Sequence, residues 1–392
     1  MKVLYVSKAL VVAAYRDKIA ALGRHVDVRA VIPERWGREP VEASPEGVPE
    51  PERVPVRMPG HNHLHLYRGA GRWIDAASPD LVHVDEEPYS LVTLQMAGLC
   101  RRRGLPWLFF TWQNLERRPP PPFGAVRSAV LRGARGALAG TDGAGRALRS
   151  AGWKGPMAVI PQFGVCPRRF APDAQARRST RARLAVPPDA FLVGYGGRLV
   201  AEKGVHVLLD AFAKLSAGPG DGERPAAPAD GADGEAAHLV LIGDGPERSR
   251  LEEHAARAGV ADRVRFTGPV PSTAMPGTLA ALDVLVLPTL GTASWTEQFG
   301  RVLVEAMACG IPVVGSLCGE IPSVIGDAGD LVPMEDAASL AEALRRLRDD
   351  APLRRRRAEA GRRRVTERFT QERVAERTVE FYRSLVGGGG VG

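Results

Sequence analysis

Short apolar runs rich in β-branched residues alternate with helical patterns along most of the chain. In the first half these runs are KVLYV, HVDVRAVI, DLVHV, PWLFFT and AVIP, and in the second half they are FLVGYG, HLVLIG, RVRFTG, DVLVLP and PVVG. Strands that alternate with helices are typical of parallel sheets with helices on both faces. The pattern therefore predicts an α/β fold built on parallel sheets.

The length of 392 residues predicts two domains, because a single core stops growing well below this size. We expect one Rossmann-like domain over residues 1–171 and a second over 191–370, joined by a polar, Pro-flanked linker over 172–190. The stretch 216–237 is rich in Gly, Ala, Pro and Asp, which predicts a disordered insertion. Residues 371–392 are predicted as a helix that crosses back to the first domain and ends in a frayed tail.

Composition narrows the class of protein. Hydrophobic residues make up 44% and charged residues 25%, and no apolar stretch approaches the span of a bilayer, which indicates a soluble globular protein. Lys8 interrupts the first apolar run, so we interpret this run as a strand rather than a signal peptide and expect a cytoplasmic location. The four cysteines include no C-x-x-C pair, which argues against a metal site, a redox motif or a disulfide framework.

The net charge of +8 is compatible with an anionic partner, although 47 of the 53 basic residues are Arg, a bias that codon usage alone can produce. No aromatic and basic interleaving accompanies the charge, so we expect no nucleic-acid partner. The Arg-rich helical pattern over 337–385 leaves peripheral membrane contact open, with a solvated helix face as the favoured alternative.

A glycine-rich loop follows the strand FLVGYG. Gly196 and Gly197 end the strand, Arg198 follows, and the next helix is predicted to begin near Gly204, just after Lys203. Ligands of parallel sheets bind beyond the carboxyl ends of the strands, where glycine allows close backbone approach and two cations suit a diphosphate. Taken alone, the loop fits equally well a tight turn with surface cations.

A second element follows the strand DVLVLP. We predict a helix over about 298–310, with Glu297 at its positive end and Glu305 about 12 Å farther along the axis. Both carboxylates can then face one groove, at a separation that matches a folded nucleotide sugar, and the amides near Phe299 and Gly300 can receive the phosphate. The alternative is an ordinary amphipathic helix.

This whole stretch resembles glycosyltransferase family four of the GT-B fold. The family signature E-x-F-G-x-x-x-x-E-A-x-A-x-G-x-P-V-V matches from Glu297 to Val314. The resemblance covers most of residues 75–375 and includes G-G-R-L-x-x-x-K-G (196–204), L-I-G-D-G-P (241–246), R-V-R-F-T-G (263–268) and I-P-Q-F-G-V (160–165).

The resemblance implies two Rossmann-like domains facing a central cleft, the first binding an acceptor and the second a nucleotide-sugar donor. It implies metal-independent transfer of the sugar to an acceptor hydroxyl with retention of anomeric configuration, without a cofactor. Among the catalytic residues that it implies, Arg198 and Lys203 would neutralise the departing diphosphate and Glu297 would hold the sugar, while Glu305 would bind the ribose. The implied donor-binding set is Gly197, Arg198, Lys203, Gly268, Val270, Glu297, Phe299, Gly300 and Glu305.

The acceptor domain departs from the family. It has no Gly-Gly pair after its first strand, and the strand PWLFFT ends without the His that many members place there. At this strand end the candidates for acceptor contacts are Trp112, Gln113 and Asn114. The alternative is that they are loop residues whose hydrogen bonds are satisfied within the loop. In the segment DLVHVDEEPYS, Glu86 is the best candidate for an acceptor contact. The alternative is that the acidic residues cap the N-terminus of the next helix. Trp112 and the segment 117–123 form either an aromatic, basic lip or a rigid polyproline loop.

Two other functions stay open at this point: a nucleotide-sugar epimerase on the same fold, and a catalytically silent nucleotide-sugar-binding protein. A nicotinamide-dependent dehydrogenase would need G-x-G-x-x-G after the first strand, which is absent. The acceptor classes that we consider are a small natural product, a polysaccharide precursor and a lipid-linked sugar.

Overall fold

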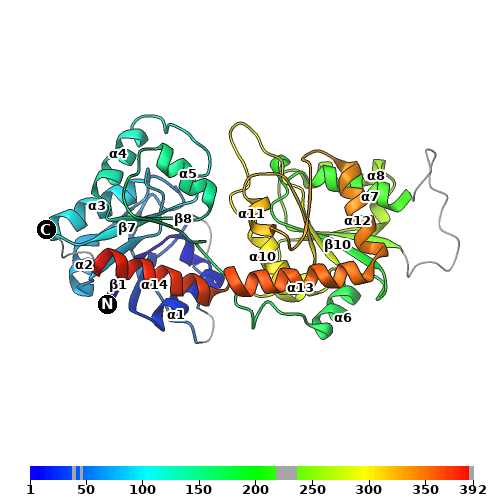
Figure 1. Cartoon of the computed structure of the whole chain (residues 1–392), viewed down its shortest axis with the longest axis horizontal. Helices are drawn as coiled ribbons and strands as arrows, with labels where there is room; N and C mark the ends of the chain where they lie inside the picture. Colours follow the sequence, from blue (N-terminus) through cyan, green and yellow to red (C-terminus); the bar gives the residue numbers. More distant parts are fainter. Residues whose placement is uncertain (38–40, 45–46, 218–235, 388–392) are drawn as a thin grey trace. The chain divides into compact units, whose positions relative to one another are not determined.

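The structure, a computed structural model, describes residues 1–37, 41–44, 47–217 and 236–387 (Figure 1). The chain forms two compact units. Unit 1 comprises residues 1–164 and the described residues from Phe369 onward, and unit 2 comprises residues Val165–Arg368. Because the chain leaves unit 1 once and returns to it once, unit 2 is a continuous insertion within unit 1.

Unit 1 is built on a seven-stranded parallel sheet with strand order β3-β2-β1-β6-β7-β8-β9. Its strands are β1 (Lys2–Val6), β2 (Asp27–Pro33), β3 (Glu52–Val54), β6 (Leu81–Val84), β7 (Trp107–Thr111), β8 (Gly136–Ala139) and β9 (Met157–Val159), with a separate hairpin of β4 (Val56–Arg57) and β5 (Leu66–Tyr67). Its helices are α1 (Asp17–Gly23), α2 (Ala70–Ala77), α3 (Leu91–Arg103), α4 (Phe123–Gly133), α5 (Asp142–Ser150) and α14 (Gln371–Gly387).

Unit 2 repeats this plan with six parallel strands in the order β12-β11-β10-β13-β14-β15. The strands are β10 (Phe191–Gly196), β11 (Ala237–Ile242), β12 (Val264–Gly268), β13 (Val284–Leu287), β14 (Val313–Ser316) and β15 (Asp330–Val332). The helices are α6 (Ala174–Arg183), α7 (Val205–Ala217), α8 (Arg248–Arg257), α9 (Met275–Ala280), α10 (Arg301–Ala308), α11 (Ile321–Ile325), α12 (Ala337–Asp349) and α13 (Ala351–Arg368).

Alternate residues of β1 show how unit 1 is layered. Val3 and Tyr5 pack in a cluster with α1 and α14, while Leu4 and Val6 pack in a second cluster with α2 and α3. Side chains of a strand point alternately to the two faces of the sheet, so these apolar runs bury both faces under helices. The predicted α/β fold with two parallel-sheet domains is confirmed.

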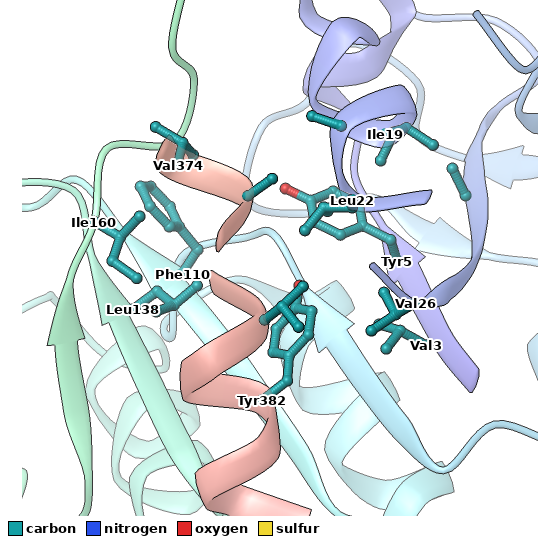
Figure 2. Packing of buried hydrophobic residues seen from close by; sticks show 14 of the residues in the cluster. Val3, Tyr5, Ile19, Leu22, Val26, Phe110, Leu138, Ile160, Val374 and Tyr382 are labelled. Atoms are coloured by element: carbon teal, nitrogen blue, oxygen red, sulfur yellow. The ribbon is translucent and has the colours of Figure 1, made fainter. Parts of the chain in front are cut away.

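Helix α14 belongs to the core of unit 1 although it lies at the far end of the sequence. Val374, Val379 and Tyr382 are at most 2% exposed and pack among residues of β1, α1 and β7. Figure 2 shows Val374 and Tyr382 pointing from α14 into this cluster. The Tyr382 hydroxyl also lies 2.5 Å from Nδ1 of His83 on β6.

Several expected boundaries differ from those observed. The expected linker 172–190 contains α6, whose helix begins at an Asp173 N-cap that accepts bonds from two backbone amides, and α6 packs on α9 within unit 2. The insertion expected over 216–237 lies outside the described residues except at its ends, where α7 closes and β11 opens. The tail expected after α14 likewise lies outside them.

Candidate active site

The candidate donor site lies at the carboxyl ends of β10 and β13, which are neighbours in the sheet of unit 2. The chain proceeds from β10 to β11 on one side and from β13 to β14 on the other, so this is the point where strand order reverses. Loops diverge at such a point and leave a crevice for ligands. The two motifs identified in the sequence occupy these two loops.

Close backbone packing shapes the loop after β10. Gly197 has φ +154°, and a Cβ atom on Gly243 would lie 2.0 Å from the carbonyl oxygen of Gly197, so only glycine fits there. The Tyr195 hydroxyl donates a 2.7 Å hydrogen bond to the carbonyl oxygen of Arg198. The Arg198 side chain is exposed beside this fixed backbone.

The loops after β10 and β13 are joined through their backbones. A Cβ atom on Gly204 would lie 2.1 Å from the Pro288 carbonyl oxygen, and the Leu290 amide donates a 2.8 Å bond to the Glu202 carbonyl. These contacts bring Lys203 against the β13 loop. The expected start of the next helix, α7 at Val205, is confirmed.

Lys203 and Glu297 form the central ion pair of the site. Lys203 Nζ lies 2.5 Å from Glu297 Oε2, and Thr289 Oγ1 donates a 3.0 Å hydrogen bond to the same oxygen. The Lys203 ammonium also lies 4.9 Å from the centre of the Trp295 ring. The two charged side chains are 19% and 9% exposed, so the pair is sheltered but reachable.

Glu297 does not lie on the helix that we predicted. Helix α10 begins at Arg301, and Gly300 before it adopts a left-handed conformation with φ 73° and ψ 54°. We predicted a helix from about residue 298 with Glu297 at its positive end, whereas α10 begins at Arg301, so Glu297 lies in the loop before the helix. Glu297 is held instead by the β14 loop, where the Glu320 amide donates a 3.0 Å bond to its carbonyl oxygen.

Glu305 lies on α10 and is 9% exposed. Arg301, one turn earlier, donates a 2.7 Å bond from Nε to Glu305 Oε1. Burial raises the pKa of the Glu305 carboxyl, and the Arg301 charge and hydrogen bond oppose this rise. A ribose hydroxyl would therefore meet a carboxylate that already has one partner.

The remaining donor candidates lie around the same edge. Gly268 ends β12 with φ +70°, and its carbonyl oxygen accepts a 3.0 Å bond from the Gly243 amide. Val270 follows two residues later and is half-buried. Phe299 is 8% exposed and packs in the core. The structure thus brings Lys203 and Glu297 into contact, with Gly197 and Arg198 in the same loop as Lys203 and Gly268 two strands away.

Unit 1 carries a second ion pair at its own point of strand reversal, between β1 and β6. Lys8 follows β1, and its ammonium pairs with the carboxylate of Glu86, which follows β6; the Lys8 amide donates a further 3.1 Å bond to Glu86 Oε1. The Glu86 side chain is fully buried, and burial raises its pKa while Lys8 opposes the rise. Glu86 is therefore already engaged, and an acceptor hydroxyl would compete with Lys8 for it.

The acidic residues after β6 do not cap α3, whose N-cap is Ser90. Asp85 Oδ2 accepts bonds from Ser7 Oγ (2.7 Å) and Gln162 Nε2 (2.9 Å). The sequence analysis did not predict Ser7, Lys8 or Gln162 as site residues. Lys8 had one available signal, since it lies two residues after the end of β1 in a chain with only six lysines.

The end of β7 is held by Glu87, whose carboxylate accepts bonds from Thr111 Oγ1 (2.7 Å) and from the Trp112 amide (2.8 Å). Trp112 Nε1 donates to Gln162 Oε1 at 2.7 Å. Gln113 donates from Nε2 to the Leu115 carbonyl at 3.0 Å, and Asn114 is half-buried. Trp112 and Gln113 thus make the local bonds expected of satisfied loop residues.

Solved structures show which class this architecture defines. Sucrose-phosphate synthase from Thermosynechococcus elongatus superposes with a TM-score of 0.72 at 22% identity, covering 99% of both chains. The Anabaena protein HepE, solved in complex with UDP, gives 0.73 at 20% identity over 98% of this chain and all of that one. The two units therefore form the GT-B fold of glycosyltransferases.

Sequence comparisons define the family more closely. The family described as "Glycosyl transferases group 1" matches residues 176–364, and "Glycosyl transferase 4-like domain" matches residues 11–162. The lipopolysaccharide core biosynthesis glycosyltransferase LpsE of Rhizobium meliloti is 33% identical over 262 residues, covering 66% of this chain and 67% of that protein. The chain belongs to the group 1 glycosyltransferases, and the predicted membership of glycosyltransferase family four is confirmed.

Other relatives match over a shorter part of their length. The 2-deoxystreptamine N-acetyl-D-glucosaminyltransferase of Streptomyces fradiae is 36% identical over 214 residues, which cover 53% of this chain and 46% of that protein. A D-inositol 3-phosphate glycosyltransferase of Streptomyces bingchenggensis is 34% identical and matches over 49% of its length. The chain thus spans about half the length of these two relatives.

No helix among the described residues is long and apolar enough to cross a membrane.

Proposed function

We propose that this glycosyltransferase moves a sugar from a nucleotide diphosphate sugar to an acceptor hydroxyl, with retention of anomeric configuration and without a metal ion or other cofactor. The observation that carries the proposal is the Lys203–Glu297 pair beside the exposed Arg198, at the strand reversal of unit 2. Two cations and a carboxylate at this place suit a ligand with a diphosphate at one end and sugar hydroxyls at the other.

Lys203 and Glu297 pair with each other in the structure. When the donor binds, its diphosphate offers Lys203 a stronger anionic partner, and the freed Glu297 carboxylate accepts hydrogen bonds from the sugar hydroxyls. The 3.0 Å bond from Thr289 keeps the carboxylate in place during this exchange. Donor binding thereby replaces the Lys203–Glu297 ion pair with two contacts, one between Lys203 and the diphosphate and one between Glu297 and the sugar.

The chemistry requires one bond to break and one to form. The bond between the anomeric carbon and the diphosphate oxygen breaks, and the acceptor oxygen bonds to the same carbon on the same face. The acceptor proton passes to the leaving diphosphate. Negative charge grows on the diphosphate as it leaves, so fixed cations at Arg198 and Lys203 stabilise the transition state more than the bound donor.

The structures of HepE with UDP and with UDP-glucose support a nucleotide sugar as the donor class. Glu305 and Gly268 are the proposed contacts to the ribose and the base. The names of the relatives indicate acceptors as different as an aminocyclitol, an inositol phosphate and a lipopolysaccharide core, so they leave the charge of this acceptor open. A cytoplasmic location remains a prediction from the sequence.

The test is a panel of nucleotide sugars incubated with the full chain and analysed by mass spectrometry for donor breakdown. We expect one donor to release its nucleoside diphosphate, and we expect Glu297→Ala to abolish that release. Interconversion of the sugar without release of nucleotide would indicate an epimerase. Nucleotide binding without turnover of any donor would indicate a silent binding protein.

A further inference from the structure

Unit 1 contains a cavity of about 330 Å³ that the donor site does not use. It lies between the segment that follows β7 and the helices α4 and α5, and its wall includes Thr111, the last residue of β7, and Pro88, which follows β6. The cavity therefore reaches the carboxyl edge of the unit 1 sheet, where ligands of parallel sheets bind. Its volume is in the range of small-molecule sites.

Most of the cavity wall is apolar. Leu115, Pro119 and Pro120 come from the segment before α4, Phe123 is the first residue of that helix, and Leu148 comes from α5. Two neighbouring prolines restrict the backbone on this side of the wall. A wall of this kind favours the apolar face of a ring over a fully hydroxylated sugar.

The charged residues that line the cavity are all basic side chains: Arg117, Arg118 and Arg127. None of the described residues that line it is Asp or Glu. Arg127, on α4, donates a 3.0 Å bond from Nη1 to the carbonyl oxygen of Arg117, which ties the loop to the helix. Guanidinium groups bind carboxylate and phosphate through paired hydrogen bonds and repel an ammonium group.

Neutral polar groups lie at the strand end of the cavity. His63 Nδ1 lies 3.0 Å from Ser90 Oγ, and burial together with Lys8 lowers the pKa of the His63 ring, so the ring is neutral at pH 7. Thr111 and Gln113 donate to Glu87 and to the Leu115 carbonyl, and this fixes both side chains. A ligand hydroxyl meets uncharged hydrogen-bonding groups at this end of the cavity.

From this arrangement we infer that the cavity binds the acceptor, and that the acceptor is an apolar ring compound with a hydroxyl group and an anionic substituent, carboxylate or phosphate. The inference rests on the proposed function, since it assigns the acceptor class of the same reaction. The apolar wall holds the ring, the arginines hold the anion, and the hydroxyl faces the strand end. An acceptor with several amino groups is excluded by the same charges.

Three phenols that differ in charge test this inference: 4-hydroxyphenylacetate, 4-ethylphenol and tyramine, titrated against the full chain by ligand-observed NMR at low salt. We expect the anion to bind at least about tenfold more tightly than the cation, which corresponds to one good charge-assisted contact. Arg127→Gln and Arg117→Gln should reduce this preference to about threefold or less. Arg132→Gln, on α4 outside this cavity, is the matched control and should keep the preference.

A second variant separates binding in the cavity from binding to surface charge. Ala151→Phe adds a ring at a half-buried position of the wall and should weaken all three phenols by a similar factor. Phenyl phosphate and inorganic phosphate complete the panel: tighter binding of phenyl phosphate than of 4-hydroxyphenylacetate assigns a phosphate-bearing acceptor, and the reverse assigns a carboxylate. Tyramine binding as tightly as the anion would overturn the inference, as would anion binding unchanged in both Arg127→Gln and Ala151→Phe.

The outcome for the cavity is independent of the outcome for the donor. UDP, titrated in parallel, should bind Arg127→Gln as it binds the parent chain, whereas Lys203→Ala should lose UDP affinity and keep the preference for the anionic phenol. If no donor is broken down but the anionic preference is present, the proposed function fails and the assignment of the cavity to an anion stands. If a donor is broken down and tyramine is preferred, only the cavity inference fails.

Discussion

The carboxyl edges of the two sheets share one plan and differ in what surrounds it. Each strand reversal places a lysine after the first strand of its unit opposite a glutamate after the neighbouring strand: Lys8 with Glu86 in unit 1, and Lys203 with Glu297 in unit 2. In unit 2 the lysine loop is GGRLVAEKG, and in unit 1 the corresponding loop is SKALVVAAY. The ion pair alone therefore does not distinguish the proposed donor site from the corresponding place in unit 1.

The difference lies in the backbone around each pair. In unit 2 the glycines 197, 204 and 243 lie so close to neighbouring backbone or side chains that a Cβ atom would clash. In unit 1 the first glycine is Gly23, and the loop after β1 buries Leu10 and Val11 instead. The glycines let the loops of unit 2 pack closely through their backbones, whereas the loop after β1 packs through apolar side chains. From this comparison we expect the pair to be exchangeable in unit 2, as the proposed donor site requires, and structural in unit 1.

The strongest test of this contrast is removal of the cations in unit 2. Arg198→Ala and Lys203→Ala should each lower kcat about 10²- to 10³-fold, because both charges act on a diphosphate whose charge grows in the transition state. Thermal melting should change little in Arg198→Ala, since Arg198 is exposed. Lys203→Ala should lower the melting temperature less than removal of the lysine in unit 1, because Glu297 is 9% exposed and keeps the hydrogen bond from Thr289. Steady-state kinetics with the identified donor measures the effect, and normal turnover in both variants would refute the donor assignment.

In unit 1 the corresponding change should act on stability instead. Lys8→Met leaves the fully buried Glu86 carboxyl without its cation and should cost about 3 kcal/mol. Five of the six tryptophans lie in unit 1, so their fluorescence during urea unfolding reports mainly on this unit.

The matched control is Lys8→Met combined with Glu86→Leu, which removes both charges and should recover most of the loss. UDP binding by unit 2 should be unchanged in the single and the double variant. If Lys8→Met were as stable as the parent chain, the Lys8–Glu86 pair would not have the structural role that we assign to it.

A smaller effect is expected at Glu87, beside the structural pair. Burial raises the pKa of Glu87 to about 7 from its ordinary value of 4.5, against the opposing bonds from Thr111 and Trp112. The folded state therefore keeps a proton that the unfolded state loses, and the stability from this group is complete below pH 4.5 and is lost as the pH rises to about 7. Glu87→Gln should remove about 2 kcal/mol of this pH dependence.

Urea unfolding midpoints of the parent chain and of Glu87→Gln, measured at pH 5, 6 and 7.5, test this prediction. The difference between the two proteins isolates the effect of Glu87 from that of its acidic neighbours. Parallel pH profiles for the two proteins would contradict the assigned pKa. The opposite slope, with the parent chain gaining stability relative to the variant as pH rises, would mean that the folded state favours the ionised form.

The smallest expected effect is that of a chelator. If Arg198 and Lys203 supply the charge that stabilises the diphosphate, EDTA should leave donor breakdown within about twofold of the untreated rate. Restoration of a lost activity by Mg²⁺ or Mn²⁺, after dialysis against EDTA, would instead assign this task to a metal.

The fold was predictable where apolar runs are long and β-branched, as in β10, β11 and β13. The sequence analysis missed β8, whose sequence is Gly-Ala-Leu-Ala. Its four residues are buried in the sheet between β7 and β9, so tertiary packing rather than intrinsic preference makes this a strand. The overestimated length of the linker has a related cause, because α6 is a polar helix that a search for apolar periodicity does not detect.

The candidate site was predictable as residue types but not as contacts. Arg198, Lys203 and Glu297 were identified from motif spacing, yet the pairing of Lys203 with a carboxylate 94 positions away depends on the backbone contact between Gly204 and Pro288. The left-handed Gly300 explains the error at α10, since a Phe-Gly pair was read as part of a continuous helix. The partners of Glu86 likewise come from a different strand end.

The return of the chain to unit 1 through α14 fixes the order in which the protein can be completed during synthesis. The ribosome releases residues 1–164 first, but the cluster that contains Tyr5 and Ile19 lacks Val374, Val379 and Tyr382 until the last helix emerges. Unit 2 is a continuous segment and has all its residues before that moment. All residues of unit 2 are therefore synthesised before the core of unit 1 has its α14 residues, and until then the partner face of α14 in unit 1 stays uncovered.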